Sequence, residues 1–125
     1  MESYWPFEKG EAQIWYMKPE TFRLYSGLGA HYMLSAGIKM PLLENLNETH
    51  VLLGTMSDVN LEGIFSMMQG EFWAPNGKAK DTIFAKGLMH TSMMVGDIIV
   101  IKNDIYMVDM VAFHVIENKK EQAHA

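Results

Sequence analysis

Residues Trp73 to Asp97 read W-A-P-N-G-K-A-K-D-T-I-F-A-K-G-L-M-H-T-S-M-M-V-G-D, and no other stretch constrains the chain path so closely. A Pro-Asn-Gly turn, a short helix, a His-Thr-Ser step and a Gly-Asp strand start follow one another. Turn residues this dense between apolar segments restrict the backbone to few conformations. They predict His90, Thr91, Ser92 and Asp97 at the edge of a sheet, where a partner could read them.

Two apolar segments after this stretch predict a closing β-hairpin. Residues 98–101 read I-I-V-I and residues 105–111 read I-Y-M-V-D-M-V, both rich in strand-forming residue types. Between them, residues 102–104 predict a three-residue hairpin loop. Residues 113–117 extend the hairpin or add a last strand.

Two helices are predicted around residues 60–87. The first runs from Leu61 to about Phe72 with Asn60 as its cap, and its apolar residues fall on one face, at Leu61, Ile64, Phe65, Met68 and Phe72. The second runs from Gly77 to Lys86, with Asn76 as its cap and Gly87 as its end.

The first half of the chain predicts two further strands. Residues 12–17 alternate weakly and are rich in aromatic and branched side chains. Residues 49–56 read T-H-V-L-L-G-T-M, a nearly continuous apolar run that suggests a central strand. Pro19 suits the first position of a short helix, and residues 26–47 read as loop-rich.

These elements predict an α+β fold: a small, mainly antiparallel sheet with two or three short helices packed on one face and a C-terminal β-hairpin. Residues 1–118 form a single domain, and residues 119–125 lose all apolar pattern and fray. The first 48 residues complete the sheet and supply an aromatic surface.

The composition favours a soluble globular chain, with 49% hydrophobic and 20% charged residues. With no cysteine there is no thiolate metal site, which fits a cytoplasmic protein. The sequence suggests no signal peptide and no membrane span. The net charge of -5 disfavours a nucleic-acid binder, because such proteins normally carry a basic patch.

Three segments in the second half carry a likeness to a known family: N-L-E-G-I-F at 60–65, H-T-S-M-M-V-G-D-I-I-V-I at 90–101 and I-Y-M-V-D-M-V-A-F at 105–113. Together they resemble the YodL-like family of small proteins of bacterial, phage and integrative-element genomes, over roughly residues 49–117. The chain departs from the family pattern at Ala112, where Gly is usual, and at Met94, where a small polar residue is common. The resemblance implies an accessory domain, often borne by mobile elements, and no reaction, because the family has no established catalytic residues.

The sequence 90–92, His-Thr-Ser, together with Asp97, can be interpreted as a hydrolytic constellation. Serine catalysis needs a base within hydrogen-bond reach of the serine and a third group that orients the base. Residues packed so closely in one segment rarely converge in that way. We therefore favour a structural role, in which Thr91 and Ser92 close the turn and Asp97 accepts hydrogen bonds from backbone amides at the strand start.

No metal or cofactor is expected. The five histidines show no pair at metal-ligand spacing, and no phosphate-binding glycine loop is present. His50 and His114 both fall in apolar strands and could meet in the fold, with Asp109 or Asp58 beside them. A histidine satisfied within the core or at its edge is the simpler interpretation.

Aromatic residues crowd the N-terminal part of the chain. Because Trp and Tyr are favoured interface anchors, an interaction or self-association surface is one hypothesis, and an aromatic lid over the sheet is the other. Together with the loop residues named above, the candidate partner-binding residues are Trp5, Trp15, Tyr16, Tyr25, Trp73, Asn76, His90, Thr91, Ser92 and Asp97.

The leading functional hypothesis is a non-enzymatic phage or mobile-element protein that binds a host protein, as in host takeover or evasion of defence. A single-stranded nucleic-acid-binding module is the second hypothesis, with base stacking on the aromatic half. The third is a homo-oligomeric component of a virion or assembly apparatus.

Overall fold

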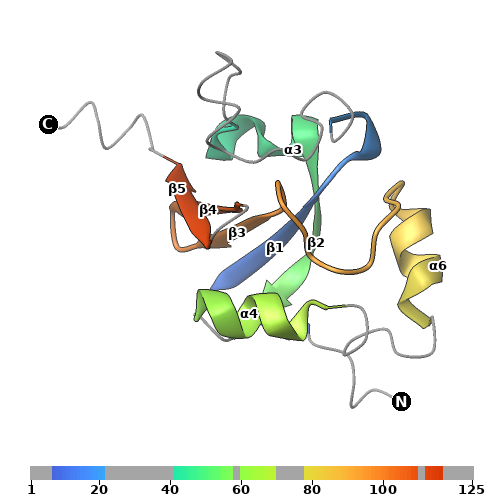
Figure 1. The fold of residues 1–125 in the computed structure, drawn as a ribbon, viewed down its shortest axis with the longest axis horizontal. Coiled ribbons are helices and arrows are strands. Elements are labelled where there is room, and N and C mark those ends of the chain that lie inside the picture. The colour runs from blue at the N-terminus through green and yellow to red at the C-terminus, as the bar shows by residue number, and fades with distance from the viewer. Residues whose placement is uncertain (1–6, 22–40, 58–59, 70–77, 110–111, 117–125) are drawn as a thin grey trace, which may run out of the picture.

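The computed structural model describes residues 7–21, 41–57, 60–69, 78–109 and 112–116. Within them, five strands form one antiparallel sheet in the order β2-β1-β3-β4-β5 (Figure 1). The strands are β1 (Ala12–Met17), β2 (His50–Met56), β3 (Ile98–Ile101), β4 (Asp104–Val108) and β5 (Phe113–Ile116). This arrangement confirms the predicted α+β class and the mainly antiparallel sheet.

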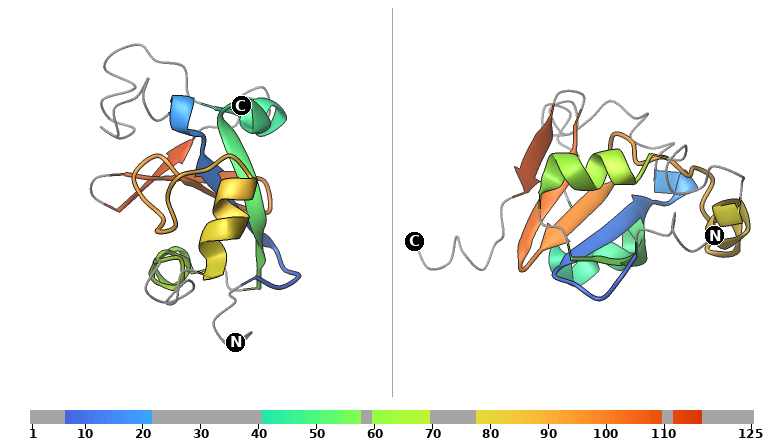
Figure 2. Two further views of the ribbon diagram at one scale, coloured as in Figure 1. Left: turned by 90° about the vertical axis from the view of Figure 1, so that its right-hand side faces the viewer. Right: turned by 90° about the horizontal axis from the view of Figure 1, so that it is seen from below.

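Short helices cover both faces of the sheet. Beside a 3-10 turn, η2 (Leu43–Asn45), they include α3 (Leu46–Thr49), α4 (Leu61–Met67) and α6 (Lys78–Ala85). Residues 19–21 are also helical, which confirms the helix start predicted at Pro19. The core on one face includes residues of α4 and α6, whereas Leu46 of α3 belongs to the core of the other face. Figure 2 shows α4 and α3 on opposite sides of the sheet. The two predicted helices thus share a face, and α3 is an addition that the sequence pattern did not predict.

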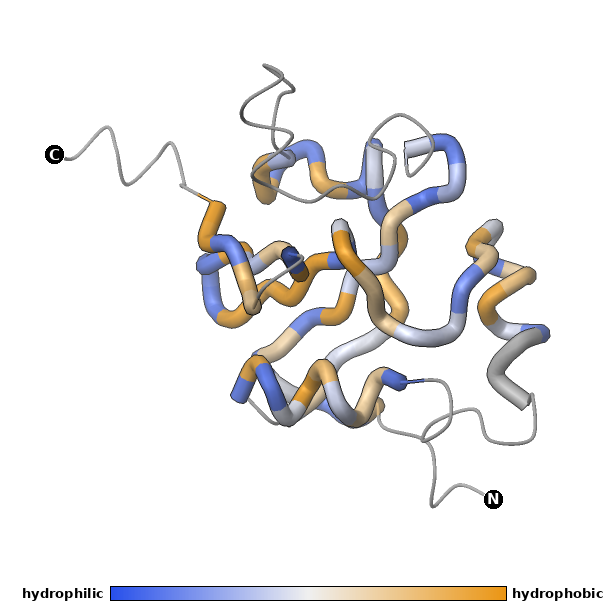
Figure 3. The backbone as a smooth tube through the Cα atoms, viewed as in Figure 1, coloured by the Kyte–Doolittle hydropathy of each residue, from blue (hydrophilic) through white to orange (hydrophobic). Residues whose placement is uncertain are grey.

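Strand β1 supplies the centre of both cores, because its side chains alternate between the two faces. Ile14 and Tyr16 pack with Ile64 of α4 and Ile83 of α6, while Trp15 packs on the other face. The opposite core is formed mostly by the closing hairpin, from Ile98, Val100, Ile105, Met107 and Ile116. The apolar run of β3 is visible along the tube in Figure 3.

Helix ends follow the predicted signals. The Asn60 side chain accepts a hydrogen bond of 2.9 Å from the amide of Gly63, which confirms it as the cap of α4. At the end of α6, Gly87 adopts a left-handed φ of 78°, and the amides of Gly87 and Leu88 bond back to Phe84 and Ile83. This pattern is a Schellman motif, which confirms Gly87 as the helix stop. Helix α4 ends at Met67, so the predicted end near Phe72 is wrong. The proposed cap Asn76 lies within residues 70–77, which are outside the described residues.

The prediction that residues 49–56 form a central strand is wrong, because β2 lies at the edge of the sheet beside β1. Its apolar run has two local causes. A bulge between Ile14 and Trp15 in the pairing leaves Leu53 as an extra residue, and Leu53 packs against the same core as Val51. The ring of Phe7 also lies against Gly54, so the strand is covered on that side.

Two further expectations need correction. The hairpin loop holds two residues, Lys102 and Asn103, because Asp104 already pairs with Ile101. His50 and His114 cannot meet across the sheet, since β2 and β5 are its two opposite edges. In the described part of the chain, no helix is long and apolar enough to cross a membrane.

Candidate functional site

Asp97 lies at the start of the central strand β3 and is completely buried. Its Oδ1 accepts a hydrogen bond of 2.8 Å from the amide of Met17, and its Oδ2 accepts one of 2.9 Å from the amide of Met94. The structural role favoured from the sequence, a carboxylate that bonds backbone amides at the strand start, is therefore confirmed. The first of these bonds joins positions far apart in the sequence, so Asp97 holds the 88–97 segment against β1.

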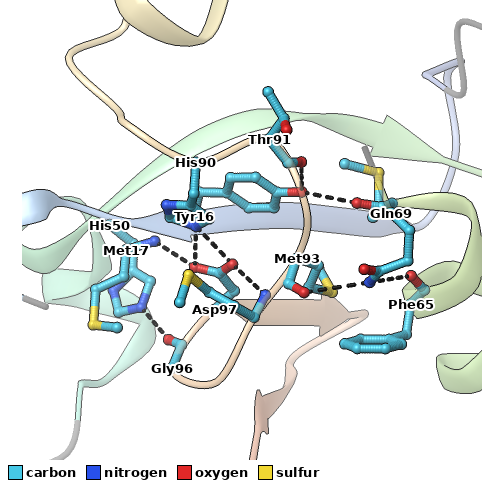
Figure 4. Close-up of polar contacts among 12 residues, drawn as sticks. Tyr16, Met17, His50, Phe65, Gln69, His90, Thr91, Met93, Gly96 and Asp97 are labelled. Carbon is cyan, nitrogen blue, oxygen red and sulfur yellow. Dashed lines mark hydrogen bonds and ion pairs between the residues drawn. The ribbon is translucent and has the colours of Figure 1, made fainter. Parts of the chain in front are cut away.

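His90 completes the partners of this carboxylate. Its Nε2 lies 2.9 Å from Oδ2 and 3.1 Å from Oδ1 of Asp97 and donates to them. The imidazole also stacks on the ring of Tyr16, with centroids 4.6 Å apart and planes 8° from parallel (Figure 4). The Tyr16 hydroxyl in turn donates to the carbonyl of Thr91 at 2.7 Å. The His90 side chain keeps 20% exposure, so it lies where this network reaches the surface.

His50 forms a hydrogen bond to Gly96, the residue directly before Asp97. Its Nε2 donates to the carbonyl of Gly96 at 2.8 Å, which leaves Nδ1 to accept from the Thr49 hydroxyl at 2.7 Å. Burial lowers the pKa of His50 below its ordinary 6.5, because the charged form is poorly solvated there; nearby Lys18 and His90 act in the same direction. The bond to Gly96 and the charge of Asp97 oppose this shift only in part.

Gly96 is required at the centre of the turn. It has a φ of 99°, which residues with side chains rarely adopt, and a Cβ there would collide with the end of the Met17 side chain. We call Tyr16, His50, His90, Gly96 and Asp97 the Asp97 cluster. Its residues come from β1, β2 and the segment before β3.

The geometry of the Asp97 cluster suits a structural role: it acts as a brace, which holds the 88–97 segment to the sheet. Both carboxylate oxygens already accept from a backbone amide and from His90. Each hydrogen bond that His90 forms with the described residues goes to Asp97, whereas a serine hydrolase also needs one between its histidine and its nucleophile. Among the described residues, no group of three acidic or histidine side chains could hold a metal ion.

The structure separates the predicted partner-binding residues. Tyr16 and Asp97 are buried. The predicted placement of Asp97 at the edge of the sheet is wrong, because Asp97 precedes the central strand, and the buried Tyr16 does not belong to an exposed aromatic surface. Their polar atoms are needed inside the fold. Half-buried positions belong to His90, Thr91, Ser92 and Trp15. The indole of Trp15 donates to Gln13 at 3.0 Å.

Four of the predicted residues, Trp5, Tyr25, Trp73 and Asn76, lie outside the described residues. The role of these side chains stays a prediction, and so does the aromatic surface to which they were assigned.

Several exposed apolar side chains were missed from the sequence, and two of them lie near the end of α6. Phe84, on α6, is 59% exposed, and Met89, just after that helix, is 72% exposed. A signal for Phe84 was present, since it follows Ile83, and consecutive residues of a helix cannot both face the core. Met89 had no such signal, because it follows the helix end.

The fold and the Asp97 cluster define a small α+β protein with a five-stranded antiparallel sheet and a braced loop before its central strand. Comparison of the chain with protein-family models, with curated proteins and with solved structures gives no match. The resemblance to the YodL-like family therefore stays a prediction.

Proposed function

We propose that this chain is a non-enzymatic protein-binding module whose contact surface centres on Phe84 and Met89. The observation that carries the proposal is the exposure of these two large apolar side chains, 59% and 72%, on either side of one helix end. A phenyl ring buries a large area on contact, and a methionine adapts its shape to an irregular partner. The two residues lie five positions apart in the sequence, and a contiguous apolar patch on a surface is typical of interaction sites.

The backbone that presents these side chains is held in place before any partner arrives. The Schellman motif fixes the end of α6, and Leu88 directly before Met89 is buried in the core. The Asp97 cluster then fixes the segment that continues to β3. Because little order remains to be gained on binding, the entropic cost of association falls.

The contacts of the Asp97 cluster also favour binding over catalysis. Both carboxylate oxygens of Asp97 are bonded inside the fold to backbone amides and His90, so they are not free to contact a substrate. The resemblance to the YodL-like family favours a bacterial host protein as the partner, and inhibition of that protein as the outcome.

The experiment is affinity capture of tagged protein from nuclease-treated bacterial lysate, with mass spectrometry of the captured proteins. We compare wild type with the double variant Phe84→Ser/Met89→Ser and with the control Leu43→Ser, which removes a side chain of 38% exposure from η2. We expect one stoichiometric protein with wild type and the control, reduced at least roughly tenfold with the double variant.

A partner retained equally by the double variant would contradict the assigned surface. A parallel capture without nuclease tests for nucleic acid. Proteins captured only when the nuclease is omitted, together with a salt-sensitive shift of single-stranded DNA, would contradict protein binding altogether.

A further inference from the structure

The two edges of the sheet differ in how they are covered. On β2, the amide of Glu8 donates to the carbonyl of Thr55 at 2.9 Å, and the bulge at Leu53 interrupts the strand. Both features block the pairing of a further strand. On β5, the sequence F-H-V-I holds no lysine, proline or acidic residue, and no strand of the described ranges lies beyond it.

The hydrogen bonds of β4 show which groups of β5 face outward. The amide of Val108 donates to Asp97 at 2.9 Å, so Val108 directs its backbone groups toward the β3 side. Successive residues alternate, so Met107 faces β5, where it pairs with His114. His114 therefore bonds to β4, and Phe113 and Val115 direct their N–H and C=O groups to the outer edge.

The side chains of these two residues share one face of the sheet. Phe113 packs edge-on against Phe65 of α4 and is half-buried. Val115, two residues on, points to the same face and is 58% exposed. An incoming strand would thus meet outward backbone groups and an uncovered valine together.

We propose that β5 pairs antiparallel with β5 of a second copy of this chain, with His114 opposite His114 of that copy. Residues opposite one another in an antiparallel pair share a face, so a symmetric pair must align residues of the same parity. In this register, Phe113 lies opposite Val115 of the second copy, and their outward backbone groups exchange two hydrogen bonds. The same contact occurs twice by symmetry, and each exposed valine meets a phenylalanine.

Charge and area set the strength of this dimer. The strand carries no acidic or basic side chain other than His114, so no fixed charges oppose one another at the contact. Each copy has a net charge of -5, so the copies repel at low ionic strength and added salt strengthens the dimer. Four-residue strands bury well below the ~800 Å² per partner of a standard interface. The dimer is therefore weak and forms at high protein concentration.

The absence of cysteine from the chain allows a clean test by cross-linking. In the proposed register, the Cα atoms of the two residues 114 lie about 4.5 Å apart, within disulfide reach, whereas the two residues 115 are offset and out of reach. We expect His114→Cys to form disulfide dimers at least roughly tenfold faster than Val115→Cys or the exposed control Asp104→Cys, at equal concentration under mild oxidation.

A second measurement does not depend on cysteine variants. Sedimentation equilibrium should show wild type dimerising as its concentration rises, and Val115→Lys at least roughly tenfold weaker, because lysine at an edge opposes pairing. Wild type that stays monomeric at the highest attainable concentration would overturn the proposal, as would cross-linking of His114→Cys no faster than the controls. Faster cross-linking of Val115→Cys would overturn the register. A captured protein whose binding depends on Phe84 bears on the proposed contact surface and not on this dimer, because Phe84 lies on α6 and not on β5.

Discussion

Single side chains decide how the loop before β3 is held. Asp97 links Met17 of β1, Met94 of its own loop and His90, and its complete burial makes each of these bonds costly to lose. A lone buried carboxylate would be strongly unfavourable, whereas one with this many donors is well satisfied. The two side chains that most resembled a catalytic pair in the sequence, those of His90 and Asp97, therefore form hydrogen bonds that hold the fold together.

His50 makes the stability of the fold depend on pH. Because burial lowers its pKa in the folded chain, the unfolded chain binds a proton at pH values where the folded chain does not. The contribution of His50 is fully present above about pH 6.5, the unfolded value, and is lost as pH falls through the folded pKa.

We expect the free energy of unfolding of wild type, measured in urea from pH 8 downward, to fall below about pH 6.5 with an added slope of up to ~1.4 kcal/mol per pH unit relative to His50→Gln. Glutamine retains a donor for Gly96 and cannot titrate. Parallel curves for the two proteins would show that His50 does not carry this dependence.

At the scale of elements, two turns use glycine for different reasons. Gly87 ends α6 with a left-handed φ and has open space where a Cβ would lie, while Gly96 has both a left-handed φ and the Met17 side chain against it. We expect Gly87→Ala to lower the free energy of unfolding by about 1 kcal/mol and Gly96→Ala by ~1 kcal/mol more, because the second change also forces the end of the buried Met17 side chain to move. Urea unfolding of both variants measures this difference, and equal losses would contradict the close packing at Gly96.

The elements differ in how far the sequence could predict them. Helix α4 was predicted because its cap, Asn60, and its apolar stripe lie within one segment. The position of β2 at the edge of the sheet could not be predicted in this way. It depends on pairing with β1, about 40 positions earlier, and on a bulge that no local pattern reveals. Helix α3 is a single turn, too short for a periodicity to identify it.

At the scale of the whole molecule, the candidate site also combines residues that a local sequence pattern could predict with residues that only strand pairing brings together. Asp97 and His90 lie in the segment that was singled out from the sequence, and the backbone-bonding role of Asp97 was predicted there. Tyr16 and His50 join them only because β1 lies between β2 and β3. Neither the stacking of Tyr16 on His90 nor the bond from His50 to Gly96 follows from sequence spacing, since both require the finished sheet.

The central claim is that the Asp97 cluster is a brace that holds the 88–97 segment to the sheet. Its most direct test is amide hydrogen exchange of wild type and Asp97→Asn, with exposed Asp104→Asn as the matched control. Asparagine keeps one acceptor oxygen and loses the other, so the amide of Met17 or Met94 loses its partner.

We expect exchange at one or both of these amides to rise roughly 10- to 100-fold in Asp97→Asn, more than at Met68 at the end of α4, and to stay unchanged in the control. Unchanged exchange at both Met17 and Met94 in Asp97→Asn would contradict the brace and return Asp97 and His90 to consideration as a catalytic pair.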